Sequence, residues 1–217
     1  WGLLMEPTYS NLRRHIYTTV AEYNCFRQIV VNCIMATDIC DKDLIKARNK
    51  RWDLAFSSEL PFGSDGNEDR QISYRKATVV IEHLIQLSDV SHTMQHWHMY
   101  RRWNERLFEE GYKAFIEGRA EKDPSENWYE GELGFYDFYI IPLAKKIKQC
   151  AVFGVSSDEY LAYALANREE WEERGKEVVK DMLDKVHITY HAGNNGRVKD
   201  PEILANPTSG NSLLSHA

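Results

Sequence analysis

The chain has 217 residues, which is enough for one domain with a hydrophobic core, and its composition is that of an ordinary folded globular protein. The formal net charge of -6 argues against a general nucleic-acid-binding surface, because such a surface needs a basic stripe. No apolar run approaches the roughly 18 residues that a membrane-spanning helix requires, so no membrane segment is expected in this chain.

The first residues, WGLLMEP, contain no initiator Met, no charged region and no apolar core of the kind found in signal peptides. This pattern suggests a piece of a longer protein, with further domains fused upstream. The four cysteines include no CxxC pair and are expected to be free thiols. Free thiols favour a cytoplasmic location, although a longer parent protein could carry a membrane anchor outside these residues.

Helical periodicity runs through most of the chain. Apolar residues at spacings of three and four predict a helix with one buried face in EYNCFRQIVVNCIMATD. Asp41 is positioned to cap the next helix, DKDLIKARNKRWDLAF. The Pro, Gly, Ser and acidic residues of 57–71 predict a loop, after which helical spacing resumes in ISYRKATVVIEHLIQLSD.

The second half of the chain predicts three more helices. The largely apolar segment GFYDFYIIPLAKKIKQC should be a buried helix that kinks or starts at Pro142. From 187 to 217 the composition shifts to Gly, Asn, Pro and Ser, which predicts a disordered tail. Strand patterns are essentially absent. The predicted fold class is therefore all-α, a multi-helix compact bundle over residues 1–186.

The stretch LSDVSHTMQHWH contains four side chains of types that bind divalent metals, namely Asp89, His92, His96 and His98. His92 and His96 would share one face of a helix, but a bare HxxxH pair is weak evidence, and Thr93 stands where an HExxH motif has its general base. A self-contained metal site is therefore not expected. Asp89 ends a predicted buried helix and needs a partner, which on chemistry alone is a basic side chain, a helix N-terminus or a metal ion.

Four blocks in order carry a family resemblance. FRQIVVNCIMATDI ends in an Ala-Thr-Asp motif, and LIQLSDVSHTMQHW holds Asp-x-Ser-His followed by a Trp. YRRWNERLFEE holds Tyr-Arg-x-Trp and a Glu pair, and ELGFYDFYIIPL holds Gly-Phe and ends in Pro-Leu. Over residues 20–185 the chain resembles the C-terminal portion of the catalytic domain of class I 3′,5′-cyclic-nucleotide phosphodiesterases.

The resemblance implies hydrolysis of cyclic AMP (cAMP) or cyclic GMP (cGMP) to 5′-nucleotides in signal transduction. In this family a hydroxide bridging two divalent metal ions (Zn and Mg or Mn) attacks phosphorus, and a histidine protonates the leaving oxygen. The implied partners are a cyclic-nucleotide substrate and fused upstream domains, with no nucleic acid.

The resemblance also implies roles for individual residues. Asp89 would be a ligand of the tighter-bound metal ion, and His92 would line the phosphate side of the site. Phe135 would stack on the purine, and Leu107 would contact the opposite face of the base. Without the resemblance, plain core packing would be the simpler interpretation of Phe135 and Leu107. Glu132 occupies the place of the family's glutamine that reads the purine edge.

Two departures from the family pattern matter. The family's other metal ligands and its proton-donating histidine lie upstream of the helices present here, and no His-Asp pair followed by His-Pro-Gly occurs in the 217 residues. Only one protein ligand for the two ions, Asp89, is thus expected, no catalytic residue is assigned, and the fragment alone should hydrolyse nothing. An ionised Glu132 would only accept hydrogen bonds. Three alternatives follow: the site prefers cGMP, a protonated Glu132 mimics the amide of glutamine, or the site is degenerate and turns over substrate weakly.

Two functions of other classes remain open. A catalytically inactive cyclic-nucleotide-binding or regulatory module would keep the fold and lose the chemistry, and it gains weight from Glu132 and from the missing ligands. A helical interaction scaffold without a small-molecule site is favoured only by the charged final helix.

Overall fold

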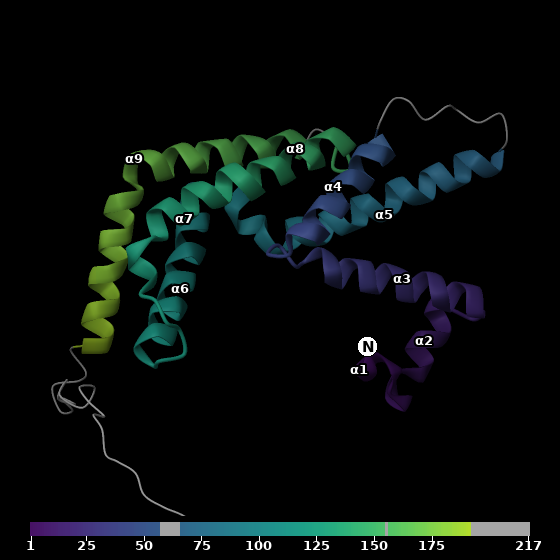
Figure 1. Cartoon of the computed structure of the whole chain (residues 1–217), viewed down its shortest axis with the longest axis horizontal. Coiled ribbons are helices and arrows are strands. Elements are labelled where there is room, and N and C mark those ends of the chain that lie inside the picture. Colours follow the sequence, from purple (N-terminus) through teal and green to yellow (C-terminus); the bar gives the residue numbers. More distant parts are fainter. Residues whose placement is uncertain (57–65, 155, 192–217) are drawn as a thin grey trace, which may run out of the picture.

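The computed structural model describes residues 1–56, 66–154 and 156–191, and every regular element in these ranges is a helix (Figure 1). The prediction of an all-α fold is therefore confirmed. The elements α5 to α9 share the main hydrophobic core, while the N-terminal helices extend away from it (Figure 1).

The N-terminal part contains three helices and one 3-10 turn: α1 (Gly2–Met5), η1 (Pro7–Tyr9), α2 (Ser10–Ile16) and α3 (Val20–Ala36). A capping box starts α3, in which the Thr19 side chain accepts from the backbone N–H of Glu22 at 3.2 Å. The Glu22 carboxylate in turn accepts from the backbone N–H groups of Thr18 and Thr19, and these bonds lower its pKa to about 2. Ala36 is the buried residue of α3, so this helix meets the rest of the fold chiefly through its C-terminal end.

Asp41 caps α4 (Lys42–Phe56) as predicted, since its side chain accepts from the backbone N–H groups of Asp43 and Leu44. The helix packs against α5 (Gly66–Val90), and Trp52, Ala55 and Val79 form a small second core between them. Because α5 begins at Gly66, the loop predicted over 57–71 is too long at its C-terminal end; residues 57–65 lie outside the described ranges.

The remaining elements follow in chain order: η2 (Ser91–Met94), α6 (Trp97–Ile116), η3 (Pro124–Glu126), α7 (Trp128–Phe135), η4 (Tyr136–Ile140), α8 (Ile141–Cys150) and α9 (Ser156–His191). The predicted start at Pro142 is confirmed, because Pro142 occupies the first turn of α8. The preceding element η4 is a π-helical turn. Proline has no N–H to donate into a regular helical ladder, and a wider turn accommodates its absence.

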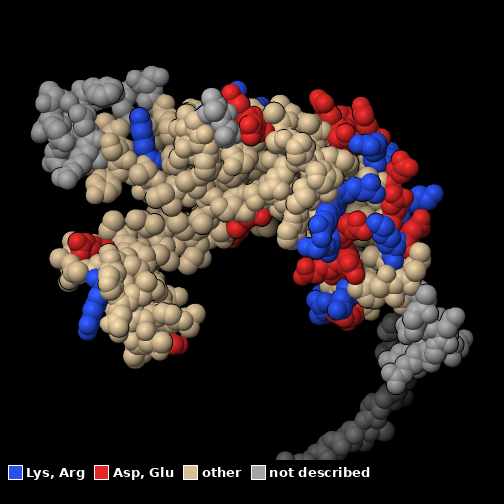
Figure 2. All heavy atoms as spheres, turned by 180° about the vertical axis from the view of Figure 1, so that it is seen from behind, with Lys and Arg blue, Asp and Glu red and all other residues tan. Residues whose placement is uncertain are grey.

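The main core is rich in aromatic side chains, and α9 packs against it along most of its length. Trp171, Tyr100, Tyr136 and Phe108 are among the largest fully buried side chains. The helix α9 runs to His191, so the tail predicted from residue 187 starts too early, and 192–217 lie outside the described residues. Figure 2 shows acidic and basic side chains intermixed on the right-hand side of the view, over the C-terminal part of α9. The N-terminal helices, at the lower left, show few charges.

The described residues include no helix that is both long enough and apolar enough to cross a membrane.

Candidate functional site

Asp89 lies in the last turn of α5 and is exposed. Within the described ranges no Lys, Arg or His side chain forms an ion pair with it. Its charge acts on the phenol of Tyr139. Burial raises the pKa of Tyr139 to about 12; the positive charge of Arg48 opposes this rise, and the negative charge of Asp89 adds to it. An exposed carboxylate without a basic partner is able to bind a cation. Asp89 can therefore supply one metal ligand, but not a complete metal site.

His92 lies in the η2 turn beside α6. Its ring is stacked with that of Tyr100 at a centroid distance of 6.4 Å and tilted toward that of Trp103 at 6.2 Å. Burial lowers the pKa of His92 below its ordinary value, which favours the neutral imidazole. A neutral imidazole donates one hydrogen bond through its protonated nitrogen and accepts one at the other nitrogen.

Glu132 points into the core. The Tyr100 hydroxyl donates to its Oε2 in a short hydrogen bond, and the Trp171 Nε1–H donates to the same oxygen at 3.3 Å. Asn104 Nδ2 donates to the Tyr100 hydroxyl at 3.1 Å, and the Trp128 indole donates to Asn104 Oδ1 at 3.0 Å. Burial raises the pKa of Glu132, and the hydrogen bonds only partly oppose that rise. The carboxyl group is thus held by aromatic donors from α6 and α9.

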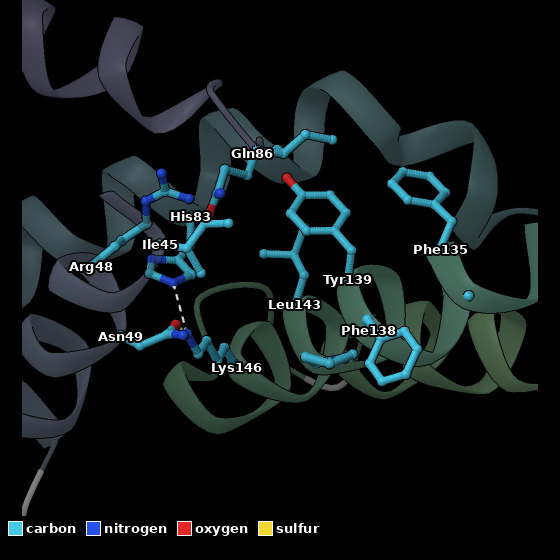
Figure 3. Close-up of a pocket in the computed structure, with 13 residues that line it drawn as sticks. Ile45, Arg48, Asn49, His83, Gln86, Phe135, Phe138, Tyr139, Leu143 and Lys146 are labelled. Atoms are coloured by element: carbon cyan, nitrogen blue, oxygen red, sulfur yellow. Dashed lines mark hydrogen bonds between the residues drawn. The ribbon is translucent and has the colours of Figure 1, made fainter. Parts of the chain in front are cut away.

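Phe135 lines a cavity of about 320 Å³ that lies between α4, α5 and the α7–α8 segment (Figure 3). Its ring is stacked with that of Tyr139 at 5.3 Å. Thirteen residues line this cavity: Ile39, Ile45, Arg48, Asn49, His83, Gln86, Gly134, Phe135, Phe138, Tyr139, Pro142, Leu143 and Lys146.

The structure brings some of the five predicted site residues together and separates others. Phe135 stacks on the ring of Tyr139, and the charge of Asp89 acts on the phenol of Tyr139. His92 and Glu132 both contact Tyr100. Leu107 is 54% exposed on α6, and it does not line the Phe135 cavity; nor do Asp89, His92 and Glu132.

The polar residues of the cavity were not singled out from the sequence. Arg48, His83 and Gln86 are all buried, and Lys146 is partly buried. A signal existed, because His83 and Gln86 interrupt the apolar run VVIEHLIQL of α5 on its buried side. Buried polar residues in such a run need partners, and here they face a cavity.

Comparison with protein families gives one match. The sequence profile described as 3′5′-cyclic nucleotide phosphodiesterase matches residues 4–155, which is more than half of the chain. The chain belongs to this family. Comparison with curated proteins and with solved structures yields no match.

The matched range of this phosphodiesterase ends just before α9. Even so, α9 contacts part of the predicted site. Its Trp171 donates a hydrogen bond to Glu132, and its Asn167 side chain donates to the backbone carbonyls of Thr93 and Gln95 at 2.9 and 2.7 Å. The helix after the matched range therefore holds the turn that follows Asp89.

The residues that the structure describes do not make a metal centre by themselves, because they contain no group of three or more His, Cys, Asp or Glu side chains that could hold an ion. A binuclear centre needs several ligands that fix coordination number and geometry. Asp89 alone does not meet that requirement, so the further ligands of such a centre would have to come from outside the described residues.

Proposed function

We propose that this phosphodiesterase chain binds a 3′,5′-cyclic nucleotide with its purine against Phe135. The observation that carries the proposal is the aromatic wall of the 320 Å³ cavity, where Phe135 and Tyr139 are stacked. Such a wall suits a flat ring, because stacking and apolar burial act on the same surface. Hydrolysis would then require metal ligands from outside the described residues, with Asp89 as the ligand that these residues contribute.

Replacing Phe135 by leucine tests the base contact. Stacking of a base on an aromatic side chain contributes about 1–3 kcal/mol. Phe135→Leu should therefore weaken binding of a fluorescent cyclic nucleotide to the 217-residue chain by roughly 5- to 150-fold. Fluorescence anisotropy measures the dissociation constant, and Phe153→Leu, at an exposed position after α8, is the matched control. Equal affinities for both variants would rule out Phe135 as the base platform.

Glu132 is proposed to set the preference between cAMP and cGMP through its protonation state, with its carboxyl group turned from Tyr100 and Trp171 toward the bound base. An ionised carboxylate can accept from the N1–H and the 2-amino group of guanine, whereas a protonated one offers a donor and an acceptor, as glutamine does. Burial raises the pKa of Glu132, so the protonated form persists to higher pH than for an exposed glutamate. The amide of Glu132→Gln could accept the same hydrogen bonds from Tyr100 and Trp171.

We expect the preference of the wild-type chain for cGMP over cAMP to rise with pH. The preference of Glu132→Gln should not change with pH and should equal that of the wild type at low pH. An unmatched polar contact costs on the order of 1–3 kcal/mol, so the difference at high pH should reach roughly ten- to hundredfold. Titrating both fluorescent nucleotides from pH 5 to pH 9 gives the two affinities. Identical pH profiles for variant and wild type would remove Glu132 from base recognition.

A catalytically inactive binding module is the second candidate. It is favoured by the orientation of Glu132, whose carboxyl group contacts Tyr100 and Trp171 instead of lining the Phe135 cavity. A turnover assay with Mg²⁺ and Zn²⁺ on a longer protein that contains this chain separates the two functions. Activity that disappears in Asp89→Asn supports the enzyme, whereas nucleotide binding without turnover supports the module. Absence of nucleotide binding leaves the interaction scaffold.

A further inference from the structure

One end of the Phe135 cavity is basic. Arg48 comes from α4 and Lys146 from α8, and Figure 3 draws their side chains on either side of His83, which comes from α5. Arg48 is 4% exposed and His83 is 1% exposed. Three helices thus bring together a buried guanidinium group, a buried imidazole and a partly buried ammonium group.

Neither cation has an acidic partner in the ranges that the structure describes. The eight ion pairs found there include neither Arg48 nor Lys146. The buried carboxylate of Glu82, which is paired with Arg51, and more weakly that of Asp38 act on Arg48 without forming an ion pair with it, and Asp53 acts on Lys146 in the same way. Removing a cation from water without a counter-ion is unfavourable, so two such cations at one cavity favour a bound anion as the missing partner.

The hydrogen bonds of Lys146 leave it a donor for a ligand. Its Nζ donates to Asn49 Oδ1 at 2.5 Å and lies 3.3 Å from His83 Nε2. The Nδ1 of His83 lies 2.6 Å from the carbonyl oxygen of Val79, which assigns the proton to Nδ1 and leaves Nε2 as an acceptor for Lys146. An ammonium group has three donors, and these two acceptors use two of them. The Trp52 ring, whose centroid lies 5.5 Å from Nζ, is an apolar neighbour and provides no counter-ion.

Arg48 is also only partly satisfied. Its Nη2 donates to the carbonyl oxygen of Asp38 at 3.2 Å and to that of Met35 at 3.5 Å. A guanidinium group has five N–H donors in a planar fork. No other partner of these donors occurs among the described residues, so part of the fork is available to an oxyanion in the cavity.

The surface next to the cavity is basic as well. Lys42, Lys46 and Lys50 recur at every fourth residue of α4 and line a shallow surface hollow with Asp53. This hollow shares Ile45 and Asn49 with the Phe135 cavity, so the two are contiguous. Exposed charges of one sign beside a cavity raise the local concentration of the opposite ion and speed its entry.

We propose that Arg48 and Lys146 form a binding site for a phosphate oxyanion at this end of the cavity. The site lies apart from Asp89, His92 and Glu132, which do not line the cavity, and it requires neither turnover nor a base on Phe135. It therefore goes beyond the function proposed above. A cavity of about 320 Å³ is at the small end of ligand pockets, which favours a monophosphate over a di- or triphosphate.

Two sources share this chemistry. One is free inorganic phosphate. The other is the phosphate of a nucleotide whose base stacks on Phe135, since the aromatic and basic ends belong to one cavity. Asp89 does not line this cavity, so a nucleotide held in this way corresponds to the inactive binding module and not to the enzyme. Competition between the two ligands distinguishes these sources.

Calorimetric titration of the 217-residue chain with inorganic phosphate at pH 7 and fixed ionic strength tests the proposal. We expect saturable binding with one site and a dissociation constant on the order of 1 mM. Lys146→Met should weaken it by roughly ten- to hundredfold, because a hydrogen bond to a charged group is lost. Lys145→Met removes the same charge from the exposed neighbouring position and should leave the affinity unchanged.

A second variant keeps both cations in place. Asn49 is exposed on α4 and its Oδ1 contacts Lys146 Nζ, so Asn49→Asp puts a carboxylate where it competes with the ligand. We expect the same roughly ten- to hundredfold loss of phosphate affinity. No saturable binding by the wild-type chain, or equal losses in Lys146→Met and Lys145→Met, would overturn the proposal.

The same titrations with cAMP separate this site from the proposed function. If phosphate displaces the nucleotide, and both Phe135→Leu and Lys146→Met weaken nucleotide binding, the site holds the phosphate of the nucleotide. Phosphate binding that Phe135→Leu does not affect, together with no binding of cyclic nucleotide, would support the anion site and contradict the proposed function.

Discussion

Replacing Trp171 with alanine is expected to lower the free energy of unfolding of the chain by about 3–5 kcal/mol. Trp171 is 0% exposed on α9, and its ring meets those of Trp97 and Tyr100 edge-on at 5.9 and 6.3 Å. The substitution leaves a cavity in the aromatic core. It also removes the N–H group that donates to the partly buried Glu132 at 3.3 Å.

The packing around Trp171 is tight enough that the surrounding helices cannot easily close over the cavity. At Gly175, one turn further along α9, an added Cβ would overlap the Trp171 ring and lie 2.8 Å from the Tyr129 ring. A side chain at this position would displace these rings, so the rings of Trp171 and Tyr129 both lie directly against the α9 backbone at Gly175. A large-to-small substitution costs less when the surrounding backbone relaxes into the space. Close contact of this kind prevents that relaxation, so the loss of stability is large.

Urea unfolding followed by far-ultraviolet circular dichroism measures this loss of stability. Trp103→Ala is the matched control, because Trp103 is 47% exposed on α6, and its effect should stay below about 1 kcal/mol. Similar losses for both variants would contradict the inference that α9 is part of the phosphodiesterase core, although α9 follows the matched range 4–155.

The helices could be predicted from the sequence because periodicity and capping are local. Asp41 starts α4 and Pro142 lies in the first turn of α8, as the sequence indicates. Periodicity does not tell what covers an apolar face. The helix α3 was expected to bury one side. Phe26, Ile29, Val30 and Cys33 on that side are only half-buried, Ile34 on the same side is exposed, and the buried residue of the helix is Ala36.

The separation of the predicted site residues could not be read from the sequence. Phe135 lines a cavity while Glu132, three residues earlier and almost one helical turn away, points to Tyr100 and Trp171. The direction of Glu132 depends on Trp171, which is 39 residues further along the chain. No local pattern encodes such a partner. Residues three apart on a helix share one face, so helical spacing alone would place Glu132 and Phe135 in the same surroundings.

The basic end of the cavity was missed for the same reason. His83 is a visible interruption of an apolar run, but its partner Lys146 is 63 residues away. A sequence indicates that a buried polar group needs a partner, and only the packing of α4, α5 and α8 shows which side chain provides it.

Acidification is expected to destabilise the chain through His83. Burial, followed by the charges of Lys146, Arg48 and Arg51, lowers the pKa of His83 from 6.5 to about 4, against the opposing hydrogen bond to Val79. Between these two values the unfolded chain binds a proton that the folded chain excludes, so stability falls as the pH falls from 6.5 toward 4. A shift of this size corresponds to about 3 kcal/mol over the whole window.

The variant His83→Gln isolates this effect, because glutamine does not titrate and other acidic and basic groups are left in place. Urea unfolding at pH 7, 6, 5 and 4.5 gives the free energy of unfolding of the variant and of the wild type. Between pH 7 and pH 4.5 the variant should lose up to about 3 kcal/mol less of this free energy than the wild type. His98→Gln, at an exposed position in α6, should keep the slope of the wild type. Parallel pH profiles for His83→Gln and the wild type would mean that His83 is accessible to protons in the folded chain. A neutral acceptor for Lys146 at the basic end of the cavity would then be lost on mild acidification, and the phosphate site would gain a third positive charge.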